Sequence, residues 1–169
     1  MSKLGALSLD NAGLAYLRSS ISPTILRDCT DLRSINSTFL FPEEPADDRN
    51  EATAGQALSK WLHTAREDGQ SKLLKCCTWA AYPKMVEKLK MAFVCALTPV
   101  SYIINLRCDE QPFEIDNVQT RERLALRHNE DNGLWLLMRY PIGECDQQWV
   151  DLKQESEISL EIGEDEYLE

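Results

Sequence analysis

The sequence is poor in histidine and has no glycine-rich loop. His63 and His128 are the only histidines, and the seven glycines form neither a phosphate-binding run nor a Gly-Lys-Ser/Thr sequence. Nucleotide-binding loops of the common kinds are therefore not expected. No nucleophile signature flanks either histidine, so the sequence assigns no catalytic residue and indicates a protein that is not an enzyme.

A long uninterrupted apolar run is also missing. The N-terminal apolar run is too short for a signal peptide. The longest apolar stretch, Met91 to Leu106, is shorter than the roughly 20 residues of a membrane span, and Pro99 divides it. We therefore expect a cytoplasmic protein without a membrane span.

The six cysteines show no spacing typical of a metal site or a disulfide framework. Cys76 and Cys77 are adjacent, whereas zinc ligands are separated by two to four residues. The others are isolated, at Cys29, Cys95, Cys108 and Cys145. We expect free thiols, no metal and no cofactor.

Charge is unevenly distributed along this acidic chain. The net charge is -10, and an acidic tail at 163–169 ends the sequence. A second acidic cluster occupies a proline-containing loop at 41–51, whereas residues 52–98 carry seven bases and three acids. Charge blocks of this kind influence partners and solubility rather than the fold.

The first half of the chain has helical periodicity. Asp10 can cap a short helix, and Ser22-Pro23 is a helix start signal. Apolar residues at helical spacing predict three longer helices, over 52–68, 71–82 and 83–97.

The period changes to two after Thr98-Pro99. Alternating apolar residues predict strands over 100–106, 121–128, 134–140, 148–153 and 157–162, and Asn132-Gly133 predicts a turn between two of them. We therefore predict one α+β domain over 1–169, with a helical N-terminal half packed on a C-terminal antiparallel β-meander of about four to five strands. The expected core residues are Trp61, Leu89, Phe93, Ile104, Leu126, Leu136 and Leu160.

Two oppositely charged groups of residues are the candidate interaction sites. The basic group is expected on two helices and comprises Lys72, Lys75, Lys84, Lys88 and Lys90. The acidic group lies in the tail and comprises Glu164, Asp165, Glu166 and Tyr167. Attraction between such groups steers association, whereas a pI near 4.7 makes nucleic acid an improbable partner.

The first hypothesis is a non-enzymatic interaction protein, such as an inhibitor, adaptor, chaperone or accessory factor, whose partner is another protein or a second copy. A self-assembling viral structural or matrix-like protein is one alternative. A small thiol-dependent enzyme built on Cys145 or Cys108 is another, for example with Cys145 paired with His128. Separately, a paired-carboxylate hydrolase would use two of the carboxylates in the loop expected after the first strand, which are Asp109, Glu110, Glu114 and Asp116.

Overall fold

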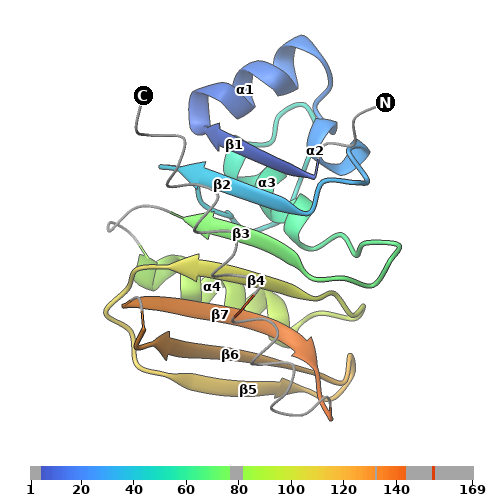
Figure 1. The fold of residues 1–169 in the computed structure, drawn as a ribbon. Coiled ribbons are helices and arrows are strands. Elements are labelled where there is room, and N and C mark those ends of the chain that lie inside the picture. Colours follow the sequence, from blue (N-terminus) through green and yellow to red (C-terminus); the bar gives the residue numbers. More distant parts are fainter. Residues whose placement is uncertain (1–4, 77–81, 132, 144–153, 155–169) are drawn as a thin grey trace.

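The computed structural model contains seven strands and four helices within the residues that it describes, which are 5–76, 82–131, 133–143 and 154 (Figure 1). The strands are β1 (Ala6–Asp10), β2 (Ser34–Thr38), β3 (Lys72–Cys76), β4 (Tyr102–Leu106), β5 (Phe113–Asn117), β6 (Glu122–Asn129) and β7 (Leu134–Pro141). The helices are α1 (Asn11–Ser20), α2 (Ile25–Asp28), α3 (Ala54–Leu62) and α4 (Tyr82–Val94).

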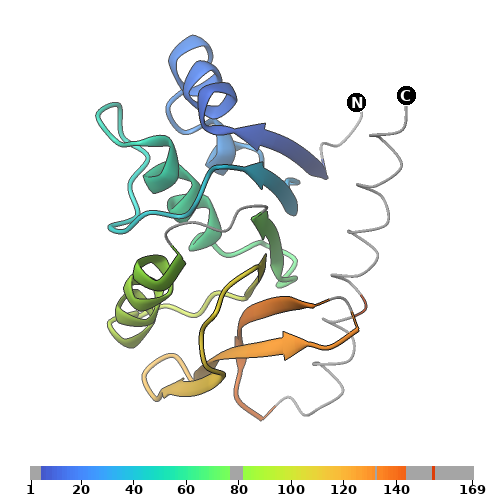
Figure 2. The same ribbon diagram turned by 90° about the vertical axis from the view of Figure 1, so that its left-hand side faces the viewer.

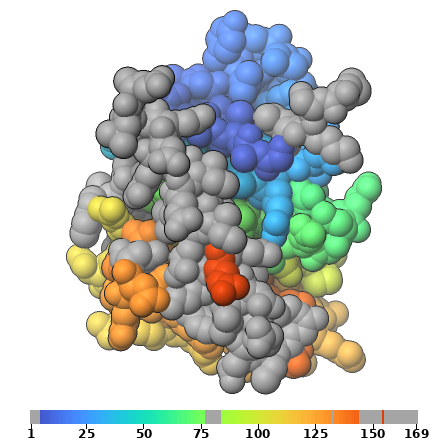
Figure 3. All heavy atoms as spheres, in the orientation of Figure 1, coloured from blue at the N-terminus to red at the C-terminus, as the bar shows by residue number. Residues whose placement is uncertain are grey.

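All seven strands form one mixed sheet in the order β1-β2-β3-β4-β7-β6-β5. The first four strands pair in parallel, and β7, β6 and β5 continue the sheet with antiparallel pairings. The helices cover one face of this sheet (Figure 2). The elements at the start of the chain and the β5–β6 pair therefore lie at opposite ends of the molecule (Figure 3).

The predicted fold class is wrong, because helices and strands alternate along the chain instead of occupying separate halves. The decisive error is the helix predicted over 71–82, since residues 72–76 form the parallel strand β3. Leu73 and Leu74 point to opposite faces of the sheet, and both are buried. A strand buried on both faces has consecutive apolar residues, and a short run of that kind also fits a helical period.

The strands β1, β2 and β5 are absent from the prediction. In β2, Ile35 is fully buried between the polar residues Ser34 and Asn36, so only a single apolar position marks the strand. In β5, the segment expected to be a loop is paired with β6, and its outward carboxylates bind arginines across the strands. Short strands with so few apolar residues carry little periodic signal.

Other predicted elements are confirmed, in part because the residues that start or end them are close to them in the sequence. Asp10 caps α1 by accepting a 2.6 Å hydrogen bond from Gly13 N. Thr53 and Gln56 form a reciprocal capping box at the start of α3. That helix ends at Leu62, before the predicted end at residue 68. The strands β4, β6 and β7 agree with prediction, and α4 corresponds to the helix expected over 83–97.

The main core lies between the sheet and its helices. The predicted core residues Trp61, Leu89, Phe93, Ile104 and Leu126 are buried there. Leu136 is also buried, but in a smaller cluster with Leu73, Ile103 and Met138 on the opposite face. Leu160 and the strands expected over 148–153 and 157–162 lie outside the described residues.

A buried ion pair joins the antiparallel strands to the connection between α4 and β4. Arg139 donates to Glu122 Oε1 at 2.6 and 3.0 Å and to the Thr98 carbonyl at 3.0 Å. The second Glu122 oxygen accepts from Val100 N at 3.1 Å. Both charged side chains are 1% exposed, so removing either one leaves an uncompensated buried charge.

Within the described residues, no helix is both long and apolar enough to cross a membrane.

Substituting Ile35 tests whether the N-terminal strands belong to the core. Because its side chain is fully buried in β2, Ile35→Ala should lower the free energy of unfolding by about 2–5 kcal/mol. Urea denaturation would measure this effect, with Ile21→Ala as a control at a 65% exposed position that should change stability by less than about 0.5 kcal/mol. Equal, small effects of the two substitutions would contradict the mixed sheet.

Candidate interaction surface

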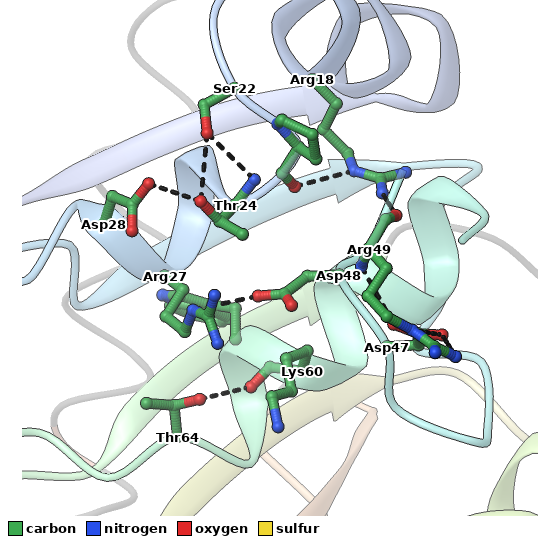
Figure 4. A network of polar contacts seen from close by, with 12 residues as sticks. Arg18, Ser22, Thr24, Arg27, Asp28, Asp47, Asp48, Arg49, Lys60 and Thr64 are labelled. Atoms are coloured by element: carbon green, nitrogen blue, oxygen red, sulfur yellow. Dashed lines mark hydrogen bonds and ion pairs between the residues drawn. The ribbon is translucent and has the colours of Figure 1, made fainter. Parts of the chain in front are cut away.

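The acidic loop at 41–51 is fastened to the helices by arginine side chains. Arg18 of α1 donates to three carbonyls, those of Pro23 at 3.0 Å, Ala52 at 2.6 Å and Arg49 at 2.7 Å. Arg27 of α2 lies 3.1 Å from the carboxylate of Asp48, which is itself buried. Figure 4 shows these side chains converging on the loop from α1 and α2. The loop is thus anchored to the helices, with Asp48 buried beneath it.

Most carboxylates of this loop form hydrogen bonds or ion pairs with other residues of the same chain. Asp47 pairs with Arg49 at 2.8 Å, and this arginine holds the pKa of Asp47 down at about 2. Glu43 accepts from Thr53 Oγ1 at 3.0 Å, and Glu44 accepts from Ser59 Oγ at 2.5 Å. These carboxylates have structural partners, so the loop is a poor candidate for a free acidic docking site.

His63 connects the same loop to the end of α3. Its Nδ1 lies 2.8 Å from the Ser59 carbonyl and 3.6 Å from Glu44 Oε1, and its ring packs edge-on against Tyr102. Burial lowers the pKa of His63, and this effect outweighs the opposing attraction of Glu44. The neutral imidazole is therefore the form that the fold favours.

The structure divides the predicted basic group between two elements. Lys72 and Lys75 lie on β3, where the Lys72 side chain is buried on the helix-covered side. Lys84, Lys88 and Lys90 lie on α4. Lys90 pairs with Glu87 at 2.8 Å and covers the ring of Phe113 at 4.0 Å, which leaves Lys84 and Lys88 as exposed lysines of this helix.

An exposed apolar patch continues from these two lysines. Lys84, Lys88 and Met91 are spaced by four and three residues and so form a stripe along the outer side of α4. Four large apolar side chains keep 59–86% of their surface exposed in the last turn of α4, just after it and just after β5, and we name them the α4 corner: Met91, Val94, Leu97 and Val118. The periodic apolar pattern of the sequence did not reveal the corner, because such a pattern does not show which positions remain uncovered.

Asn117 brings Val118 to the end of α4. Its side-chain amide donates to the carbonyls of Phe93 at 2.7 Å and Ala96 at 3.0 Å, which satisfies backbone acceptors at the helix C-terminus. Asn117 Oδ1 accepts from Gln119 N and Thr120 N in the turn that follows β5. The corner is therefore built on a hydrogen-bonded junction with defined geometry.

A separate cavity of about 380 Å³ is lined by some of the residues considered for the two enzyme hypotheses. Cys108, Asp109 and His128 line it at the carboxyl end of β4, and the ring of His128 lies 5.0 Å from that of Trp135. Burial raises the pKa of the Cys108 thiol, which opposes formation of a nucleophilic thiolate. Glu114 and Asp116 instead pair with Arg127 and Arg123 on the sheet.

Several predicted site residues cannot be placed. Cys145 and the tail residues Glu164, Asp165, Glu166 and Tyr167 lie outside the described residues. Cys29, Cys76, Cys95 and Cys108 are thiols rather than members of disulfides. Among the residues that the structure describes, no group of three or more histidine, cysteine or carboxylate side chains is arranged to hold a metal ion.

The fold is thus a mixed sheet covered on one face by helices, with an apolar and basic corner at one of them. Comparison with protein-family models, curated proteins and solved structures finds no match to this chain.

The histidine at the end of α3 predicts a pH dependence of stability. Because the folded state lowers the pKa of His63, the unfolded chain binds the proton more readily, and stability should fall as the pH drops below about 6.5. Thermal unfolding between pH 7.5 and 5 should therefore show a smaller loss of Tm in His63→Gln than in the wild type. His128→Gln, at an exposed histidine, is the control and should keep the wild-type slope. Identical slopes in all three proteins would contradict the prediction.

Proposed function

We propose that this protein is a non-enzymatic interaction factor that binds another protein through the α4 corner and the adjoining Lys84 and Lys88. The partner surface would combine apolar side chains with nearby carboxylates. Apolar contact supplies affinity in such an interface, and the charged rim supplies orientation and association rate.

The observation that carries this proposal is the concentration of exposed apolar surface at one place. Eight large apolar side chains are exposed among the described residues, and four of them form the α4 corner. Single exposed apolar residues are ordinary, whereas a group of neighbouring ones marks an interaction site. Met91 is also an adaptable side chain that suits binding surfaces.

The charge distribution supports an acidic partner. Four of the five acids of the 41–51 loop have internal partners, whereas Lys84 and Lys88 are exposed on the helix that leads to the corner. Because the whole chain has a net charge of -10, this local excess of positive charge would orient an acidic partner toward α4.

Substitutions at the corner test the proposal. The double variant Met91→Asp/Leu97→Asp should fold normally, because both side chains are more than 60% exposed, and should lose the partner because a charge would be buried in the interface. Quantitative mass spectrometry of proteins captured from the native cell would compare it with the wild type. A partner retained equally by the double variant would refute the corner as the binding site.

A matched control uses the apolar residues exposed elsewhere. Ile21→Asp/Phe39→Asp introduces the same charges at positions that are 65% and 73% exposed but distant in sequence from α4. This variant should capture the partner as the wild type does.

Lys84→Glu/Lys88→Glu tests the charged rim of the interface. This variant should slow association mainly at low salt, since exposed charges are screened over about 8–10 Å at physiological salt.

Deleting residues 163–169 separates binding to another protein from self-assembly. The tail has the chemistry expected of the partner, with Tyr167 and Leu168 among carboxylates. If a second copy is the partner, the deletion should abolish concentration-dependent association in analytical ultracentrifugation, and the corner double variant should do the same. If another protein is the partner, the deletion should leave its capture unchanged.

A further inference from the structure

The face of the sheet opposite the helices has an apolar centre. The four helices of the described residues lie on the other face (Figure 2). Successive side chains of a strand point to opposite faces, so β3, β4 and β7 place one apolar group together on the helix-free face. We name this group the β3–β4–β7 cluster: Leu73, Ile103, Leu136 and Met138.

Strand pairing alone does not explain how deeply this cluster is buried. Side chains stand roughly perpendicular to a sheet, so those on an uncovered face keep water on their outer side. Ile103, Leu136 and Met138 are each only 1% exposed, and Ala125, which is in register with Met138, is 0% exposed. Within the described residues, no helix lies on this face. The cluster therefore requires a cover from another part of the chain or from another molecule.

A polar residue on the same face also requires a partner. Asn105 lies two positions after Ile103 in β4, so it points to the helix-free face, where it is 6% exposed. Its Oδ1 is buried and has no hydrogen-bond partner in the described structure. Buried acceptors are nearly always paired, so a donor is expected in whatever covers this position.

The segment that follows β7 is well placed to supply the cover. It leaves the sheet at the end of the strand that contributes Leu136 and Met138. The cluster spans three neighbouring strands and is about 10 Å wide, because strands are spaced by about 4.8 Å. Residues 144–162 can cross this width in any backbone conformation, since even a helix advances about 1.5 Å per residue.

The other stretches outside the described residues are less suitable. Residues 1–4 precede β1 at the edge of the sheet, where two strands separate them from β4. Residues 77–81 connect β3 to α4 and so lead toward the opposite face.

The composition of residues 144–162 matches what the helix-free face lacks. The segment has six apolar residues that can pack on the cluster: Trp149, Val150, Leu152, Ile158, Leu160 and Ile162. It also has six acids and one base, and Lys75 lies on this face in register with Asn105. The two arginines of β6 on the same face already pair with carboxylates of β5. Apolar burial is therefore the main attraction, and charge adds a contact at Lys75.

We propose that the helix-free face is a docking site that is occupied by the chain's own C-terminal segment, residues 144–162. The apolar residues of the segment pack on the β3–β4–β7 cluster, and one of its polar groups donates to Asn105 Oδ1. Because the segment begins beside the cluster, the connection is short and closing it costs little entropy. The α4 corner lies on a helix of the other face, so this inference is independent of the proposed function.

Nuclear Overhauser effects between methyl groups test the contact in the full chain. Ile103 and Met138 should show effects to Leu152, Ile158 or Leu160, because packed apolar side chains approach within about 4.5 Å. Effects only to residues outside 144–162 would overturn the proposal. Effects found only between differently labelled copies in a mixed sample would assign the face to a second copy and would overturn it as well.

A soluble gadolinium chelate, which speeds the relaxation of exposed methyl groups, measures the cover itself. In the wild type, Ile103 and Met138 should be as protected as Leu58 in the main core, and Val118, which is 86% exposed, marks the unprotected rate. Fast relaxation of Ile103 and Met138 in the wild type would overturn the proposal.

A triple variant tests whether the C-terminal segment provides this protection. In Leu152→Ser/Ile158→Ser/Leu160→Ser, Ile103 and Met138 should lose their protection and approach the rate of Val118, while Leu58 stays protected. Unchanged protection of the cluster would overturn the proposal.

Tyr167→Ser/Leu168→Ser is the matched control, because it changes apolar residues of the tail outside 144–162. This variant should leave Ile103 and Met138 protected, and a loss of their protection would overturn the assignment to residues 144–162. If the triple variant does not fold, the Overhauser effects in the wild type decide the matter.

Discussion

The arrangement of the helices depends on the order of the parallel strands, which in the sheet is the same as their order along the chain. From β1 to β4 each strand is placed beside the previous one, and a helical connection links each to the next. Parallel crossovers have one preferred hand, so strands added in a constant direction place their helices on the same face. Figure 2 shows the four helices of the described residues on one face of the sheet. The helices bury one side each and leave their outer sides uncovered, which is why α4 can present lysines and apolar residues together.

Buried arginines hold the connections of this layer in place. Arg18 donates hydrogen bonds to three carbonyls in the chain around the acidic loop. Arg139 donates hydrogen bonds to Glu122 and to the Thr98 carbonyl in the connection that leads into β4. Each satisfies backbone or carboxylate groups that would otherwise be buried without partners. The loop and the turn have no regular secondary structure of their own, so these side chains define their position and, with it, the ends of α3 and α4.

The α4 corner is a surface that the fold leaves largely in water. Its four apolar side chains keep 59–86% of their surface exposed. The hydrophobic free energy of burying that remaining area is therefore available to a partner.

Elements with local signals could be predicted from the amino-acid sequence: the cap at Asp10, the helix that includes Leu89 and Phe93, and the antiparallel strands around Gly133. Most of the core could be predicted as well, because burial follows hydrophobicity. The parallel strand at 72–76 required the folded chain, since a short apolar run fits both periods and the choice depends on β2 and β4 as neighbours. The same pairing turned Lys72 from an expected surface residue into a buried one, because the position of a side chain in a sheet depends on strands that are distant in sequence.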